Sequence, residues 1–171
     1  STEKGFLSSK TQETHDAVTD NTAISSTLSG DKVNITAGHD VIVSGSNVLG
    51  TQDVAINAGN QLNVTTVDET QDETHISKTT KSGIMGTGGI GFTVGKTSEK
   101  VTQESESNQQ KGSVIGSSAG DVILTAGNTA NIHGSDVIAA KDIKVTASDI
   151  HITAAENSRT DLTKVETKSS G

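Results

Sequence analysis

The chain repeats itself at two scales, and these repeats constrain its fold more than any single residue does. Alternating Val and Ile residues, interrupted by Ala-Gly or Gly-Ser pairs, recur about every 21 positions, as at Ala37-Gly38 and Ala58-Gly59. The segment that begins at Val33 returns 89 positions later at Val122, with 9 identities in 27 aligned pairs. Strand-like repeats of about 21 residues are typical of stacked coils. The sequence therefore predicts a β-solenoid.

The composition agrees with a thin, coiled core. Thirty-seven of 171 residues are Leu, Ile, Val or Phe, while Pro, Cys, Trp and Tyr are absent. A compact globule of this length would use aromatic bulk in its core. A solenoid coil needs only stacked Val, Ile, Leu and Ala. Disorder is the alternative for so polar a chain, but a disordered chain would not keep a phase of 21 and 89 residues. Between the two patterned blocks, disorder stays open.

Charge and hydropathy exclude several classes of partner and location. The formal net charge of −8 argues against nucleic acid, which requires clustered Lys and Arg. The sequence contains no run of 18 apolar residues, so it predicts no transmembrane helix. The first ten residues are polar and lack the apolar region of a signal peptide. The repeat is already under way at the start and unfinished at Gly171, which predicts a fragment, so a missing signal does not bear on export of the parent protein. The absence of cysteine excludes disulfides and zinc-thiolate sites.

Each coil is expected to contain three short strands with one apolar face, and glycines at the corners. The inward side chains are expected to be those of Val33, Ile35, Val43, Val54, Ile56, Val122, Leu124, Ile132, Ile143 and Val145. The predicted fold class is all-β, a parallel right-handed β-helix with polar β-ribbon excursions. The handedness follows from the preference of parallel crossovers. The expected organisation is one repeat solenoid over 1–171, with solenoid blocks at 23–65 and 114–155, an excursion at 66–113, and partial excursions at 1–22 and 156–171.

The excursion at 66–113 is expected to be a mobile antiparallel ribbon with an apolar, Gly-rich tip. Its flanks are polar and rich in Thr, and the segment from Gly83 to Gly95 combines glycines with apolar residues. One interpretation is that the tip packs back against the solenoid. The other is that it contacts a partner or a membrane, through the candidate residues Ile84, Met85, Ile90, Phe92 and Val94.

Motifs that carry chemistry elsewhere fail here on their context. Gly86 to Gly91 matches G-x-G-x-x-G, but strand-type sequence follows it where a dinucleotide site needs a helix. Gly95-Lys96-Thr97 lacks the glycine that a phosphate-binding loop requires at Ile90. The acidic residues of the excursion have no aromatic platform for sugars and are interpreted as a solvated face; they are Asp68, Glu69, Asp72 and Glu73.

The five histidines show neither HxH nor HExxH spacing, and their repeat partners differ. Asp53 and Asp142 occupy a recurring corner position and lack the glycine-rich spacing of calcium-binding nonapeptide repeats. No nucleophile and base stand out as a pair. We therefore predict no catalytic residue, no cofactor and no metal site, and hence no enzymatic activity.

The order V-N-I-T-A-G, V-S-G-S-N-V and D-V-A-I-N-A-G, followed by an insert with G-I-G-F-T-V-G, resembles the haemagglutinin repeat of filamentous-haemagglutinin-like exoproteins from Gram-negative bacteria. It is most similar to the second repeat region of contact-dependent growth-inhibition proteins. The resemblance implies two-partner secretion, a β-helical filament on the cell surface and delivery of a C-terminal toxin into neighbouring bacteria. An adhesin module that binds host glycans or proteins is the alternative, and it predicts a surface patch that breaks the repeat symmetry. The implied partners are neighbouring repeats of the same parent chain and the outer membrane or a surface receptor of the target cell, and not nucleic acid.

Overall fold

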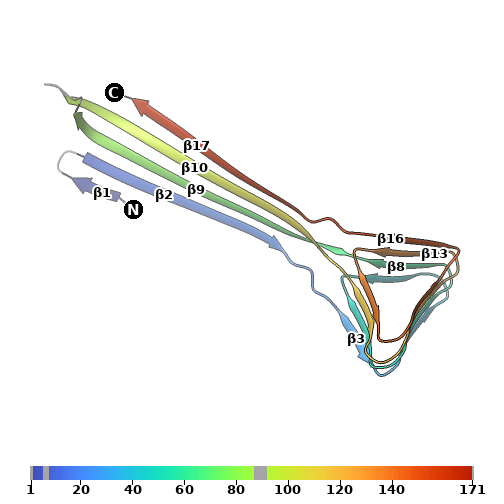
Figure 1. Cartoon of the computed structure of the whole chain (residues 1–171). Helices are drawn as coiled ribbons and strands as arrows, with labels where there is room; N and C mark the ends of the chain where they lie inside the picture. Colours follow the sequence, from blue (N-terminus) through green and yellow to red (C-terminus); the bar gives the residue numbers. More distant parts are fainter. Residues whose placement is uncertain (1, 6–7, 87–91, 171) are drawn as a thin grey trace. The chain divides into compact units, whose positions relative to one another are not determined.

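The computed structural model describes residues 2–5, 8–86 and 92–170, with side-chain environments for 8–84 and 94–170. These residues form strands, turns and irregular segments, and none of the described residues is helical (Figure 1). The chain divides into two compact units. The first comprises Ser1–Asp20, Gln71–Ser107 and Arg159–Gly171, and the second comprises Asn21–Thr70 and Asn108–Ser158.

The second unit consists of three parallel sheets of four strands each. The sheet orders are β14-β11-β6-β3, β15-β12-β7-β4 and β16-β13-β8-β5, so successive strands visit the three sheets in turn. Four coils result, which are β3 (Thr27–Gly30), β4 (Val33–Ala37) and β5 (Val41–Ser44); β6 (Asn47–Gly50), β7 (Val54–Ala58) and β8 (Gln61–Thr65); β11 (Val114–Ser117), β12 (Val122–Ala126) and β13 (Thr129–His133); and β14 (Asp136–Ala139), β15 (Ile143–Thr146) and β16 (Asp149–Thr153). The prediction of an all-β fold with parallel sheets is confirmed, and the arrangement is compatible with a β-helix.

The strand register stacks equivalent residues in columns that run from coil to coil. One column contains Val33, Val54, Val122 and Ile143, and the next inward column contains Ile35, Ile56, Leu124 and Val145. Parallel strands in register point equivalent side chains to the same face of the sheet. The alternation of apolar residues in the sequence therefore produces a continuous apolar interior.

Burial follows the columns in the two middle coils and weakens at the fourth. Val54, Ile56, Val122 and Leu124 are fully buried, and Val33, Val43 and Ile132 are nearly so. Ile143, which was expected to point inward, shares the column of the buried Val122 but is 49% exposed. No described strand covers β15 on the side away from β12. Ile35 and Val145 are half-buried for the same reason, since each lies in an outermost coil.

Gly-Ser pairs form the corners that join successive coils. Gly45 and Gly134 have φ values of 53° and 52°, a left-handed conformation that glycine adopts readily. In the third coil the equivalent pair is Gly112-Ser113, and Ser113 is fully buried. Its hydroxyl oxygen lies 2.8 Å from the carbonyl oxygen of Thr65, which it can reach as a donor, and accepts a hydrogen bond of 3.2 Å from the amide of Ser46. This serine therefore joins the coils on both sides of the 66–111 segment.

Polar ladders stabilise the outer positions of the stacked coils. The Asn128 side chain donates a hydrogen bond of 2.6 Å to Asn60, and Asn131 donates one of 2.7 Å to Asn63. At another corner, carboxylate oxygens accept hydrogen bonds from backbone amides of the next coil at 3.2 Å, from Asp121 to Asp53 and from Asp142 to Asp121. The recurring Asp53 and Asp142 therefore connect coils.

The long strands form a separate five-stranded sheet with the order β1-β2-β9-β10-β17. Its strands are β1 (Thr2–Gly5), β2 (Ser8–Asn21), β9 (Val67–Gly86), β10 (Phe92–Lys111) and β17 (Ser158–Ser170). β1 and β2 pair in antiparallel register. In β9 and β10, Thr66 contacts Gln110 at the base and Thr80 contacts Ser98 farther along, so one residue number falls as the other rises. β9 and β10 are therefore antiparallel as well.

Candidate functional site

The candidate tip lies where β9 ends and β10 begins. Ile84 is 44% exposed and Val94 is 69% exposed. Met85 and Phe92 lie within the two strands, but the structure does not describe their side chains, and Ile90 lies outside the described residues. The two described members of the set therefore expose apolar surface on neighbouring strands, and the tip's contact role stays a prediction.

Hydroxyl groups and polar side chains align the strands that lead to the tip. The hydroxyl oxygens of Thr80 and Ser98 are 3.5 Å apart across β9 and β10. On the other side of β9, the imidazole of His75 contacts the carboxylate of Asp16 on β2. These contacts fix the register of a sheet whose side chains are too polar to bury an apolar core.

Charged side chains on β17 pair along the strand and with β10. Arg159 Nε lies 2.9 Å from Asp161 Oδ2, and Lys164 Nζ lies 2.9 Å from Glu166 Oε1. Hydrogen bonds from Arg159 and from the Ser105 hydroxyl hold the pKa of the Asp161 carboxyl below its ordinary value. These groups are exposed, and exposed ion pairs add little to stability. The hydrogen bond from the Ser105 hydroxyl to Asp161 links β10 to β17.

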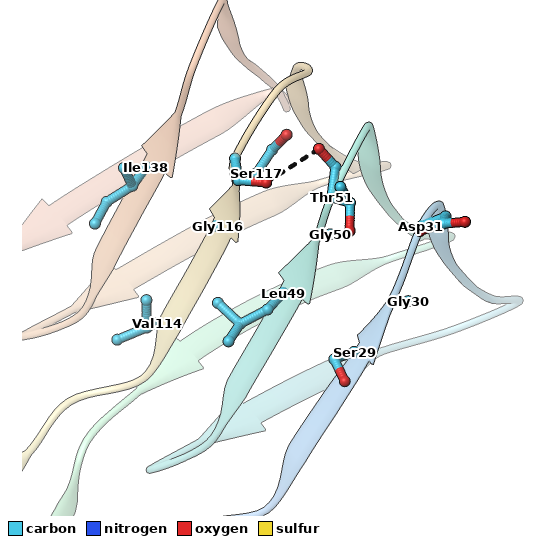
Figure 2. A pocket seen from close by; sticks show the side chains of 11 residues that line it. Ser29, Gly30, Asp31, Leu49, Gly50, Thr51, Val114, Gly116, Ser117 and Ile138 are labelled. Carbon is cyan, nitrogen blue, oxygen red and sulfur yellow. Dashed lines mark hydrogen bonds between the residues drawn. The ribbon is translucent and has the colours of Figure 1, made fainter.

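A second surface feature lies on the outer face of the sheet β14-β11-β6-β3. Leu49, Val114 and Ile138 project from successive strands, while Gly116 leaves a gap between Leu49 and Ile138 (Figure 2). The depression has a volume of about 630 Å³, and the hydroxyl of Ser118 donates a hydrogen bond of 3.2 Å to the Thr51 carbonyl at its rim. It breaks the repeat symmetry, because Gly116 replaces the large side chains of its column neighbours.

Neither this depression nor the buried Ser113 was predicted from the sequence. A signal for Ser113 was present, since Gly112-Ser113 repeats the pairs Gly45-Ser46 and Gly134-Ser135. For the depression, the signal was Gly116 between Leu49 and Ile138, in a column that begins with Ser29.

The motifs and acidic residues that could hold a cofactor or a metal are dispersed. Gly95, Lys96 and Thr97 lie inside the extended strand β10, which does not form a phosphate-binding loop. Most of the G-x-G-x-x-G motif lies outside the described residues. Within residues 2–5, 8–86 and 92–170, no three His, Asp or Glu side chains are grouped as a metal site would require. Over the same residues, the structure contains no helix capable of crossing a membrane.

Among the acidic residues of the excursion, Glu69 has structural partners at its base. The Glu69 carboxylate accepts a hydrogen bond of 3.2 Å from the amide of Ala23 and lies 3.9 Å from Lys111 Nζ. Asp68, Asp72 and Glu73 are more exposed. The contacts of Glu69 anchor the base of β9, whereas Glu73 lines a depression together with Glu104 and Asp161.

Comparison with known proteins shows that this chain is similar to a repeat family and to segments of much longer proteins. The hemagglutinin repeat family matches residues 93–171. The chain is 42% identical over 169 residues, 98% of its length, to a tRNA nuclease CdiA of Escherichia coli O6:K15:H31. It is 40% identical over 172 residues to a 16S rRNA endonuclease CdiA of Enterobacter cloacae, and 38% identical over 144 residues to a deoxyribonuclease CdiA of Yersinia pseudotuberculosis.

The matched relatives are much longer than this chain. The match with the Enterobacter protein spans 99% of this chain but 5% of that protein. The match with the Yersinia protein spans 84% of this chain and 13% of that protein. The Escherichia relative is likewise covered over 5% of its length. No solved structure matches the chain. The names of these relatives therefore describe whole proteins, and the region similar to this chain is a small part of each.

Proposed function

Because this chain belongs to the hemagglutinin-repeat family, we propose that it is a non-catalytic structural segment of a large secreted cell-surface filament that supports contact-dependent toxin delivery into neighbouring bacteria. The observation that carries the proposal is 42% identity to a CdiA protein over 98% of the chain. The columns of stacked side chains add a physical reason, since each coil buries its apolar face against the next and so builds length without a globular core.

The names of the relatives support a non-catalytic role. Relatives named as a tRNA nuclease, a 16S rRNA endonuclease and a deoxyribonuclease share this segment at 42%, 40% and 38% identity. The identity is about the same whichever activity the relative is named for. This is expected of a segment that is common to proteins with different toxins. The nuclease activities then belong to other parts of those proteins.

The proposed filament is a β-helix that winds to the right, since roughly 98% of crossovers between parallel strands are right-handed. Its location is the cell surface of a Gram-negative bacterium, after two-partner secretion of the parent protein. Its partners are neighbouring repeats of the same parent chain and, at the target cell, the outer membrane or a surface receptor. Nucleic acid is not among them, because the net charge of −8 opposes binding to phosphate.

We assign contact with the target cell to the tip of the β9–β10 ribbon. Ile84 and Val94 expose apolar side chains there, and Met85, Ile90 and Phe92 are close to them in sequence. Apolar surface at the end of a polar ribbon suits contact with a membrane or an apolar receptor surface.

Co-culture with target bacteria tests both parts of the proposal in the parent protein. Ile84→Asp combined with Val94→Asp is expected to reduce inhibition of target growth while surface display stays unchanged. Val18→Asp is the matched control, since Val18 is 60% exposed on β2, away from the tip. Unchanged inhibition with the double variant would refute the role of the tip. Unchanged inhibition after removal of one whole repeat would contradict a role of the segment in delivery.

The adhesin alternative rests on one specific observation, the depression around Gly116 that breaks the repeat symmetry. Gly116→Val would fill the gap between Leu49 and Ile138, because a Cβ there already lies 3.3 Å from Leu49 Cδ2. Loss of attachment to host cells with unchanged inhibition of target bacteria would favour adhesion. The reverse result would favour delivery.

A further inference from the structure

One pairing interface occurs twice in the five-stranded sheet. One solenoid column contains Val64, Ile132 and Ile152. Val64 precedes β9 and Ile152 precedes β17, so the strands that leave the solenoid recur after 88 residues. Another column contains Thr27, Asn47 and Val114. β2 precedes Thr27 and β10 precedes Val114, so the strands that enter the solenoid recur after 87 residues. These offsets relate β9 to β17 and β2 to β10.

The contacts repeat with these offsets. The amide of Ala23 donates a hydrogen bond of 3.2 Å to the Glu69 carboxylate, and the amide of Gln110 donates one of 2.8 Å to the Asn157 side chain. Ala23 corresponds to Gln110, and Glu69 corresponds to Asn157. The pairing of an entering strand with the leaving strand that follows it, β2 with β9 and β10 with β17, is therefore one repeated interface.

The strand at the centre of the sheet, β9, leaves the solenoid and pairs along both of its edges. One edge pairs with β2, and the other pairs with β10, the entering strand of the following repeat. β17 is the equivalent strand one unit later, and among the described strands its one neighbour is β10. Every described side chain of β17 is exposed. The edge that in β9 binds the next entering strand is open in β17.

We propose that the open edge of β17 is the pairing surface for the entering strand of a second copy of this unit, the following repeat in the parent chain. The excursions of successive repeats then form one continuous antiparallel sheet. Charge on β17 favours this occupant over unrelated strands, because charged residues on an edge strand oppose indiscriminate pairing. Opposite charges neutralise each other within each of the pairs Arg159–Asp161 and Lys164–Glu166. Little electrostatic repulsion toward the expected partner strand then remains. The inference does not require toxin delivery.

A chain extended by one unit tests the proposed pairing. Gly171 corresponds to Gly83, so residues 84–171 appended after Gly171 continue the repeat in phase. Thr80 lies 3.5 Å from Ser98 through their hydroxyls, and Thr80 corresponds to Lys168. The chain has no cysteine, so Lys168→Cys combined with Ser98→Cys in the appended copy gives one possible disulfide. We expect it to form within the monomer on mild oxidation and to be detected by non-reducing electrophoresis and mass spectrometry.

Two matched variants decide the result. Thr80→Cys with Ser98→Cys in the 171-residue chain must form a disulfide, because that pair is already in contact. Thr167→Cys with Ser98→Cys of the appended copy must stay reduced, because adjacent strand residues point to opposite faces. A reduced Lys168–Ser98 pair beside an oxidised Thr80–Ser98 pair would overturn the proposal, as would equal oxidation of the Thr167 pair. Hydrogen exchange without cysteines gives an independent measure, since the amides of β17 should exchange more slowly in the extended chain and unchanged exchange would contradict the pairing.

Discussion

Val54 and Val122 are direct register partners in adjacent parallel strands, although the whole 66–111 segment lies between them in sequence. Both are fully buried. The solenoid therefore closes across the excursion as if the inserted residues were absent. Ser113 supports this closure from its buried position next to the Thr65 carbonyl.

Removal of Thr66–Lys111 should leave the solenoid folded. The deletion joins Thr65 to Gly112-Ser113 and gives Thr-Gly-Ser at positions equivalent to the first corner, Ser44-Gly45-Ser46. We expect a β-type circular dichroism spectrum and a cooperative thermal transition. Removal of one residue more, Thr66–Gly112, deletes the corner glycine and should lower the Tm. A shorter chain without a cooperative transition would show that the solenoid depends on the excursion.

Truncation of the central columns should destabilise the fold strongly. Ile56→Ala and Leu124→Ala should each lower the free energy of unfolding by about 2–5 kcal/mol, through lost burial and a residual cavity. Both side chains are fully buried, whereas Ile143 in the fourth coil is 49% exposed. Ile143→Ala should therefore cost less than about half as much, and Thr74→Ala almost nothing. Urea denaturation measures the series, and equal effects at all four positions would refute the assigned faces.

Loss of the Ser113 hydroxyl should be costly for its size. Ser113→Ala leaves the amide of Ser46 and the Thr65 carbonyl without this partner in a buried site. Removal of one partner of a buried hydrogen bond costs about 1–3 kcal/mol. Ser118→Ala, at an exposed serine, is the control and should change the free energy of unfolding by less than about 0.5 kcal/mol. Identical denaturation curves for the two variants would contradict the role given to Ser113.

The corner glycines should differ in their tolerance of alanine. Gly45→Ala places a side chain at a φ of 53° and a Cβ 2.8 Å from Val67 Cγ2, which should cost at least about 1–2 kcal/mol. Gly38→Ala meets no atom within 4 Å and should be neutral or stabilising by up to about 1 kcal/mol, since alanine restricts the unfolded chain. A comparison of Tm values checks the sign of each change. Destabilisation by both variants to the same extent would argue against a special corner.

The Asp161 carboxyl should titrate at a pH below that of an ordinary aspartate. Its pKa is lowered first by the hydrogen bond from Arg159 and then by that from Ser105. A lowered folded-state pKa contributes stability above the unfolded pKa, and this contribution is lost as the pH falls through the folded value. Carboxyl chemical shifts in NMR should show the low midpoint, and Arg159→Gln should raise it. An unchanged midpoint in Arg159→Gln would remove the pair as the cause.

Much of this fold was readable from period and alternation. Val33 and Val122 align at 89 residues in the sequence, and the structure places them in one column with Val54 between them. The direct partnership of Val54 and Val122 could not be read from the repeat, because it depends on how the chain closes across the excursion. The exposure of Ile143 was missed because burial depends on what covers a coil, which the pattern of a single strand does not encode.

The surface features were harder to predict than the core. The exposed Ile84 and Val94 could be placed in a ribbon from the glycine content and polarity around them. The depression at Gly116 escaped notice, because it arises from three strands that lie far apart in sequence and adjacent in space. Outer-face positions have no common burial requirement, so their chemistry varies from coil to coil.

Closure across the excursion also bears on how genes for such chains can change. A recombination event that adds or removes one unit of 88 residues would join two equivalent positions of the same column. Val64 and Ile152 are one such pair of positions. The new junction would keep every column in register, so the length of the parent protein can vary by whole units without a new fold having to arise.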